Sequence, residues 1–111
     1  MEVQKLLKKK HPPSDEEVVN VLGHSVNALY SVPTAIYCFL KSSQSSDGNL
    51  IKHTLEYTIS LGGDTDTIAS MACALAGSFY SDTCIGENLI KHCEGSDEII
   101  QLADQLYEVV K

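Results

Sequence analysis

Hydrophobic residues recur along this chain at the three- and four-residue spacing of amphipathic helices. The clearest example is residues 96–110, whose apolar stripe consists of Ile99, Leu102, Ala103, Leu106 and Val110. A sustained alternation of apolar and polar positions, which would indicate a strand, is absent from the sequence. The pattern therefore predicts an all-α protein.

Capping and turn signals divide this pattern into separate helices. Ser14, with Glu17 three residues later, forms a capping box, and Gly23 is expected to end the helix that starts there. Residues 31–33 (Ser-Val-Pro) are expected to open the next helix, because proline is tolerated in a first turn. The expected helices cover residues 1–10, 14–22, 32–41, 50–61, 67–80, 87–93 and 96–110.

Two of these segments, 32–41 and 67–80, lack a clear polar face. Each is therefore expected to pack against neighbours on several sides, and the small residues of 67–80 allow close approach. Residues 41–49 and 82–86 are expected to form a polar surface loop and a turn. The remaining helices need not cover both apolar segments, which suggests that the chain belongs to a larger helical body.

The segment 62–67, Gly-Gly-Asp-Thr-Asp-Thr, places carboxylates and hydroxyls at the start of a helix rich in small residues. Asp64 and Asp66 would diverge inside a helix, because only residues three or four apart share a face. The two preceding glycines permit a backbone turn that brings the carboxylates together. Converging oxygen ligands suit a hard divalent cation such as Mg²⁺, Mn²⁺ or Ca²⁺.

An ordinary helix start is the alternative interpretation, because Asp and Thr are common N-cap residues and glycines often end a preceding helix. A cap needs one side-chain oxygen, however, and this segment supplies several in succession. A capping box is also missing, since Ala69 follows Asp66 where Glu or Gln is required. An EF-hand is excluded, because the fifth and twelfth positions counted from Asp64 are Ile68 and Leu75. The surplus of oxygens favours a metal site.

The chain has 111 residues, enough for one domain, and a formal net charge of −7. This charge argues against a general nucleic-acid-binding protein, which would carry a basic stripe. All eight basic residues are lysines, so bidentate recognition of phosphate by arginine is excluded. Phosphate recognition would have to depend on metal ions, helix N-termini and backbone amides.

The cysteines and histidines indicate no further site. No C-x-x-C pair occurs among Cys38, Cys73, Cys84 and Cys93. Cys84 with the pair at 92–93 (His-Cys) does not match a usual zinc spacing. Single, ordinary histidines are expected at His11, His24 and His53. With neither a signal peptide nor an apolar run long enough to span a bilayer, we expect an intracellular, reduced protein that does not bind membranes.

Residues 62–77, Gly-Gly-Asp-Thr-Asp-Thr-Ile-Ala-Ser-Met-Ala-Cys-Ala-Leu-Ala-Gly, strongly resemble the metal motif of the ADP-ribosylhydrolases. These are all-helical glycohydrolases that use a pair of magnesium or manganese ions. Residues 11–23 and 31–40 are similar to the third vertebrate branch, which hydrolyses ADP-ribosylserine and degrades poly(ADP-ribose). The resemblance covers residues 1–111 and implies the C-terminal portion of an orthogonal helical bundle, the fold of an ADP-ribosylglycohydrolase domain.

By this resemblance, Asp64, Asp66 and Thr67 are metal ligands that supply half of a dinuclear Mg²⁺ site, in which Mn²⁺ is also possible. Asp66 is expected to contact both ions. The family's other ligands form a Thr-Asp-Asp cluster, and this chain contains no such run. None of the three residues is expected to act as an acid or nucleophile, so no catalytic residue is assigned. We therefore expect the isolated chain to bind metal weakly and to be inactive.

The resemblance also implies a substrate contact and partners. Val26 is the apolar residue matching the loop that borders the adenosine end of the ligand, and a plain packing role is its alternative. The expected partner of the full-length enzyme is ADP-ribose or an ADP-ribosylated protein. A monomer without direct nucleic-acid binding is implied, acting in the DNA damage response in the nucleus, cytoplasm and mitochondrion.

Two interpretations from other classes stay open. Residues 64–66 (Asp-Thr-Asp) resemble the Asp-x-Asp signature of haloacid-dehalogenase phosphotransferases, but that signature needs a preceding strand and a β/α alternation. The other is a non-catalytic helical fragment or interaction module, in which Asp66 merely caps a helix.

Overall fold

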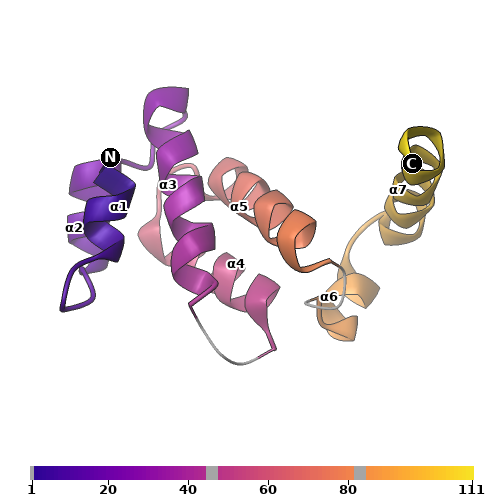
Figure 1. Cartoon of the computed structure of the whole chain (residues 1–111), viewed down its shortest axis with the longest axis horizontal. Coiled ribbons are helices and arrows are strands. Elements are labelled where there is room, and N and C mark those ends of the chain that lie inside the picture. The colour runs from indigo at the N-terminus through magenta and orange to yellow at the C-terminus, as the bar shows by residue number, and fades with distance from the viewer. Residues whose placement is uncertain (1, 45–47, 82–84) are drawn as a thin grey trace.

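The computed structural model describes residues 2–44, 48–81 and 85–111. Within these ranges the chain forms helices and no strand, so the predicted all-α class is confirmed. The helices are α1 (Glu2–Leu7), α2 (Asp15–Leu22), α3 (Ala28–Ser42), α4 (Leu50–Leu61), α5 (Thr65–Tyr80), α6 (Glu87–His92) and α7 (Ser96–Val110). Figure 1 shows α3, α4 and α5 at the centre, with α1 and α2 on one side and α6 and α7 on the other.

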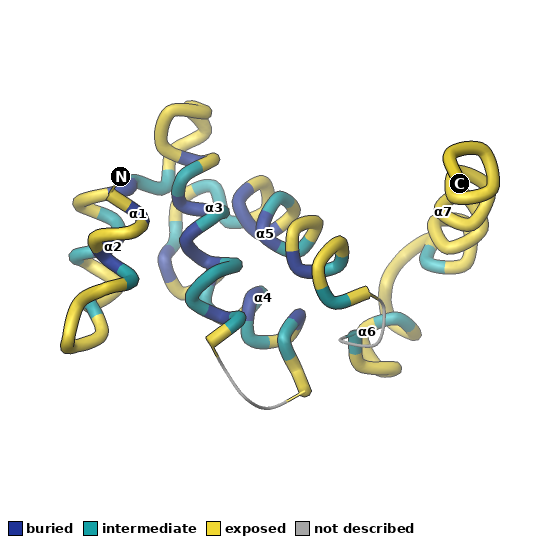
Figure 2. The backbone as a smooth tube through the Cα atoms, in the orientation of Figure 1, coloured by how far each residue is buried: buried dark blue, intermediate teal, exposed yellow. Residues whose placement is uncertain are grey.

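The core lies where α3, α4 and α5 meet and where α1 and α2 cover α3 (Figure 2). Its buried members are Val3, Leu6, Val18, Leu22, Ala35, Tyr37, Cys38, Leu61, Ile68 and Ala72. On α5 the buried face carries mainly small side chains, including Ala69, Ala72 and Ala76. Such side chains let the helix axes come close together, which explains the dense packing of α5 against both α3 and α4.

A second cluster extends the packing toward α6. Ile51 and Ala76 are its buried residues, and Phe39 and Tyr80 pack against them with ring centroids 6.3 Å apart. Ile85, which precedes α6, joins this cluster. The contact attaches the start of α6 to the central helices, whereas α7 has no buried residue at all.

Several predicted boundaries are confirmed by the backbone. The Glu17 amide donates to the Ser14 side chain at 3.1 Å, as the predicted cap of α2 requires, and Gly23 ends that helix with φ +84°. Helix α4 spans the predicted residues 50–61 and ends at Gly62. Residues 82–84 of the predicted turn at 82–86 lie outside the described residues.

The predicted start of the third helix was wrong. Helix α3 begins at Ala28, because the Asn27 side chain accepts a 3.0 Å hydrogen bond from the Leu29 amide and caps it there. Pro33 therefore lies inside the helix rather than in its first turn. The helix also runs to Ser42, into the predicted polar loop.

Two other boundaries differ in smaller ways. Helix α1 ends at Leu7 rather than at residue 10, before the run of lysines whose like charges disfavour a further turn. Helix α5 begins at Thr65, two residues earlier than predicted, so Asp66 lies within its first turn.

Helix α7 projects away from the other helices (Figures 1 and 2). Residues 97–111 are all exposed, and the predicted apolar stripe is exposed with them, including Leu102 at 63% and Leu106 at 64%. Within the described residues, the stripe therefore does not face a core. No helix of the described ranges is both long and apolar enough to cross a bilayer.

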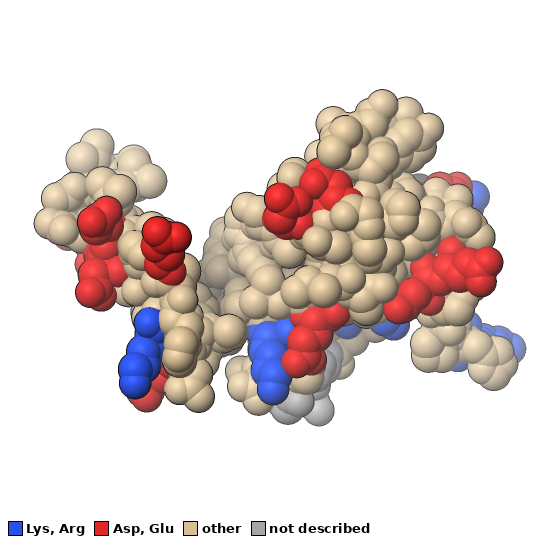
Figure 3. Space-filling model, turned by 180° about the vertical axis from the view of Figure 1, so that it is seen from behind, with Lys and Arg blue, Asp and Glu red and all other residues tan. Residues whose placement is uncertain are grey.

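Charged side chains are distributed unevenly over the surface. In the face shown in Figure 3, acidic side chains form several separate groups, whereas lysines lie mainly along one edge. The described ion pairs are exposed, including Lys5–Glu2 at 3.1 Å and Lys111–Glu108 at 2.9 Å. Exposed pairs of this kind contribute little to stability, so the packing of α3, α4 and α5 carries the fold.

Candidate metal-binding site

The candidate site is built on the sharp turn between α4 and α5. Gly62 ends α4, and its amide donates to the Ile59 carbonyl at 3.1 Å. Gly62 and Gly63 have φ values of +76° and +70°, in the left-handed region that favours glycine. The predicted role of the paired glycines in turning the backbone is therefore confirmed.

Asp64 occupies the N-cap position of α5 without acting as a side-chain cap. Its carbonyl accepts the first helical hydrogen bond, from the Ile68 amide at 3.0 Å, but its carboxylate makes no capping bond. An Asp at this position usually stabilises the helix by roughly 1 kcal/mol through such a bond. Asp64 thus holds the N-cap position without a capping bond, whereas Asp66 lies inside the helix and accepts from the Thr67 amide.

The side chains of Asp64 and Asp66 interact with each other. The interaction with the Asp64 side chain is the main cause that lowers the pKa of Asp66, and the Thr67 amide, 2.9 Å from Asp66 Oδ1, is the second. Both effects favour ionised Asp66. The positive end of the α5 dipole lies at the same place and favours the same charge state.

The motif leaves its oxygens accessible. Asp66 and Thr67 are exposed, and Asp64 is half-buried. Within the described ranges, no cluster of three or more His, Cys, Asp or Glu side chains is placed to hold a metal ion. Two carboxylates and a hydroxyl are hard oxygen ligands that fit Mg²⁺ or Mn²⁺, but they make up only part of the usual octahedral shell.

A groove runs beside the motif, between α4 and α5. Its volume is about 410 Å³, and its lining residues are Leu55, Ile59, Thr65, Asp66, Ala69, Ser70 and Cys73. Leu55 and Ile59 give it an apolar side, while Asp66 and Thr65 contribute polar atoms. This groove is the concave surface adjacent to the paired carboxylates.

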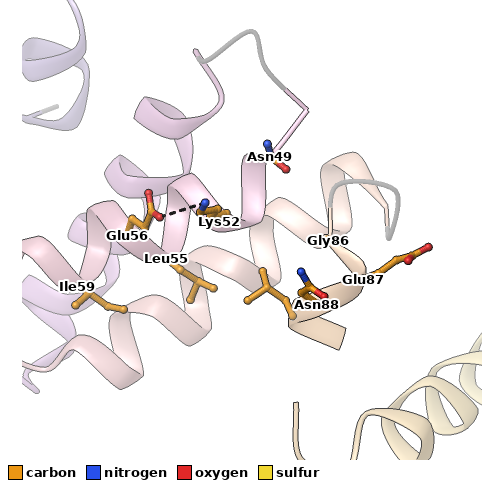
Figure 4. A pocket seen from close by; sticks show the side chains of 9 residues that line it. Asn49, Lys52, Leu55, Glu56, Ile59, Gly86, Glu87 and Asn88 are labelled. Atoms are coloured by element: carbon orange, nitrogen blue, oxygen red, sulfur yellow. Dashed lines mark ion pairs between the residues drawn. The ribbon is translucent and has the colours of Figure 1, made fainter. Parts of the chain in front are cut away.

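A larger groove of about 670 Å³ lies between α4 and α6, away from the motif (Figure 4). It shares Leu55 and Ile59 with the first groove, so these α4 side chains separate the two. Lys52 and Glu56 form an exposed ion pair at 3.9 Å along α4, on one side of this groove (Figure 4). The Lys52–Glu56 pair and the amide side chains of Asn49 and Asn88 do not converge on one point (Figure 4). We therefore assign the candidate site to the Gly62–Thr67 segment.

The loop that connects α2 and α3 contacts this segment. The Asp64 amide donates a 2.8 Å hydrogen bond to the carbonyl oxygen of His24. Val26, on the same loop, is 80% exposed and so is not a packing residue in the described chain. The His24 contact could not be predicted from a local pattern, because it joins residues far apart in the chain and uses a backbone atom.

The remaining thiols and histidines form no competing site in the part of the chain that is described. Cys38 is buried, and burial raises the pKa of its thiol to about 11. Cys93 is exposed, and His92 Nδ1 lies 2.8 Å from the Asn88 carbonyl oxygen. The predicted absence of a zinc site at 84, 92 and 93 stays a prediction, because residue 84 lies outside the described residues.

Comparison with known proteins identifies the family. The family model described as ADP-ribosylglycohydrolase matches residues 1–111. The chain belongs to this family. It is 48% identical to the ADP-ribosylhydrolase ARH3 of Homo sapiens over 99 residues, covering 85% of this chain and 27% of that protein. The mouse ARH3 is also 48% identical, over 86% of this chain and 27% of its own length.

A fish relative extends the match. The ARH3 of Danio rerio is 44% identical over 110 residues, which is 95% of this chain and 30% of the relative. The recognition made from the sequence motifs is therefore confirmed. The chain spans less than a third of the length of these relatives. The phosphotransferase interpretation is excluded, because helix α4 rather than a strand precedes Asp64.

Proposed function

We propose that this chain contributes to a magnesium-dependent hydrolase of O-glycosidic ADP-ribose linkages, with ADP-ribosylserine and poly(ADP-ribose) as substrates. In this proposal Asp64, Asp66 and Thr67 supply half of a dinuclear metal site, in which Mn²⁺ can replace Mg²⁺. Membership of the ADP-ribosylglycohydrolase family supports the reaction class. The length shared with the relatives supports a role as part of a larger catalytic domain.

One observation carries the metal assignment. The Asp64 carboxylate lies at a helix N-cap, makes no capping bond, and interacts with Asp66. Two carboxylates close together repel each other unless a proton or a cation lies between them. A divalent cation bound between the two side chains would neutralise the pair.

The charge state of Asp66 also argues against a role as a general acid. Glycosidases that use two carboxylates need one of them protonated near neutral pH, with a raised pKa. The pKa of Asp66 is instead lowered, and the side chain is exposed. Ionised oxygens of this kind are suited to act as ligands. When bound, the metal pair would orient the ribose hydroxyls and polarise a water molecule.

Val26 is proposed to contact the adenosine end of the ligand. Its side chain is 80% exposed, which leaves an apolar surface available to an aromatic base. The loop that carries it is fixed to the metal segment by the hydrogen bond between the Asp64 amide and the His24 carbonyl. A ligand reaching from the carboxylates to this loop would therefore meet a surface of defined position.

A chimera tests the proposed function. The matched segment of the human relative is replaced by that of this chain, and release of ADP-ribose from a serine-modified peptide is measured with Mg²⁺ and with EDTA. We expect magnesium-dependent release, and a loss of roughly a hundredfold or more in the chimera with Asp66→Ala. Asp104→Ala, on exposed α7, is the matched control and should retain activity. Full activity of the Asp66→Ala chimera would refute the ligand assignment.

The 111-residue chain alone is proposed to lack activity. Its motif offers part of a coordination shell, so metal binding should be weak and no turnover is expected. The exposed apolar stripe of α7 also favours the alternative role of a non-catalytic helical fragment or interaction module when the chain is alone. Catalysis by the purified 111-residue chain would show that this account of the missing ligands is wrong.

A further inference from the structure

The direction of Asp64 is set by a contact outside the motif. Its amide donates to the carbonyl oxygen of His24 at 2.8 Å, and its backbone has φ −81° and ψ +62°. This hydrogen bond anchors the residue just before α5 begins. The Asp64 carboxylate makes no capping bond to the helix amides. The position of the His24 carbonyl therefore decides where the Asp64 oxygens lie.

The backbone just before His24 is in turn held by helix α3. Thr34, which is fully buried, donates its hydroxyl to the carbonyl of Gly23, the residue preceding His24. The same hydroxyl lies 2.8 Å from the Tyr30 carbonyl, one turn earlier in α3. The Gly23 amide donates to the Val19 carbonyl at 2.8 Å. Gly23 is thus tied to α2 through its amide and to α3 through its carbonyl, which belongs to the peptide unit before His24.

The two loops are also in close steric contact at Gly63. A Cβ atom at this position would lie 2.2 Å from the His24 carbonyl oxygen and 2.4 Å from its Cγ. Only a glycine leaves room for the His24 backbone to approach so closely. Gly62, by contrast, has open space around the corresponding position. The approach is therefore specific to Gly63 and His24.

We infer that Thr34 is a positioning residue for Asp64, acting through the backbone of Gly23 and His24. In this arrangement the buried hydroxyl fixes the Gly23–His24 peptide, and the His24 carbonyl fixes the Asp64 amide. The orientation of the Asp64 carboxylate then depends on a side chain that touches neither metal nor substrate. The consequence for metal affinity rests on the proposed function, whereas the consequence for the Asp64 backbone does not.

Thr54 provides a matched control. It is as deeply buried as Thr34, at 1% exposure, and donates to the carbonyl four residues earlier, Leu50, at 2.8 Å. Its hydroxyl thus bonds within α4 and not to the loop that contacts Asp64. Thr54→Val and Thr34→Val remove the same atom from similar surroundings, so any general loss of packing should affect both variants.

The test uses the full 111-residue chain with Mn²⁺ as the probe. Amide hydrogen exchange at Asp64 is measured by NMR, and Mn²⁺ affinity by paramagnetic broadening of amides 64–67. We expect Thr34→Val to speed exchange at Asp64 about tenfold relative to the core amides and to weaken Mn²⁺ binding by about tenfold. Thr34→Ser should restore both quantities, and Thr54→Val should change neither.

Gly63→Ala gives a second way to break the contact if Thr34→Val fails to fold, with Gly62→Ala as its control. Unchanged Asp64 exchange in folded Thr34→Val, or equal effects of Thr34→Val and Thr54→Val, would overturn the inference. If Mn²⁺ causes no broadening near Asp64 in the unmodified chain, the metal proposal fails. The exchange at Asp64 still decides whether Thr34 positions it.

Discussion

Gly63 and His24 approach so closely that no side chain larger than hydrogen fits between them. The contact joins the turn before α5 to the loop before α3, two segments that the sequence gives no reason to pair. It also lies next to the Asp64 amide, which donates to His24. The proposed metal ligands are therefore held by a long-range contact and not only by the local turn.

Gly63→Ala should destabilise the chain more than Gly62→Ala. Both substitutions place Ala at positive φ, which costs roughly 1–2 kcal/mol. At Gly63 the new Cβ also meets the His24 backbone, adding about 1–3 kcal/mol of steric strain. Urea denaturation of the two variants checks the difference. Equal losses of stability would show that the close approach is not present in solution.

Asp64→Ala should raise the pKa of Asp66 toward its usual value of 3.8, because the Asp64 side chain is the main cause of the lowered pKa. The change is measured by carboxyl-carbon NMR titration of the metal-free chain. Asp104→Ala, on exposed α7, is expected to leave the pKa of Asp66 unchanged. An unaltered titration of Asp66 in Asp64→Ala would mean that the carboxylates do not lie together.

The stability of the fold should decline at alkaline pH because of Cys38. Burial raises its pKa from 9.0 to about 11 in the folded chain, so the folded state binds the proton more tightly than the unfolded state. The stabilising contribution is complete below pH 9 and is lost as the pH rises toward 11. Urea denaturation across this range should show a shallower decline for Cys38→Ala than for the unmodified chain.

Cys93→Ala is the control for this experiment, since Cys93 is exposed and lies outside the core. It should follow the pH dependence of the unmodified chain. Burial also raises the pKa values of Tyr37 and Tyr57, and both variants retain these groups. An identical pH dependence in Cys38→Ala would show that the thiol does not contribute.

Helix α7 should be the least protected helix of the chain. Residues 97–111 are all exposed, and isolated helices of this length are marginally stable in water. Amide exchange in α7 should therefore be much faster than in α5. Removal of residues 96–111 should change the free energy of unfolding of the central helices by less than about 0.5 kcal/mol. A larger loss would indicate that α7 packs on the core in solution.

Much of this arrangement could be predicted because its signals are local. The Ser14 cap, the glycines at 62–63 and the apolar spacing of α4 and α7 each specify structure within a few residues. The third helix was predicted to begin at residues 31–33 because proline is tolerated in a first turn, whereas the Asn27 cap starts it at Ala28. The Asn27 side chain pairs the Leu29 amide at the new helix start, and the helix accommodates Pro33 in its interior.

The role of His24 could not be predicted, because no local pattern encodes it. As a single histidine it was interpreted as ordinary, and its contribution comes from a carbonyl oxygen that every residue possesses. Two contacts distinguish His24 from other residues. Thr34 donates to the carbonyl of the preceding Gly23, and Gly63 lies directly against the His24 backbone. Only the folded backbone brings these residues together.

The uncapped carboxylate of Asp64 has a consequence for anyone engineering this chain. Because its side chain contributes no capping bond, a selection that rewards heat resistance alone would have no reason to keep it. Variants selected for thermal stability could therefore carry other residues at position 64 and lose the proposed metal ligand while gaining stability. Libraries based on this scaffold should therefore hold Asp64 constant.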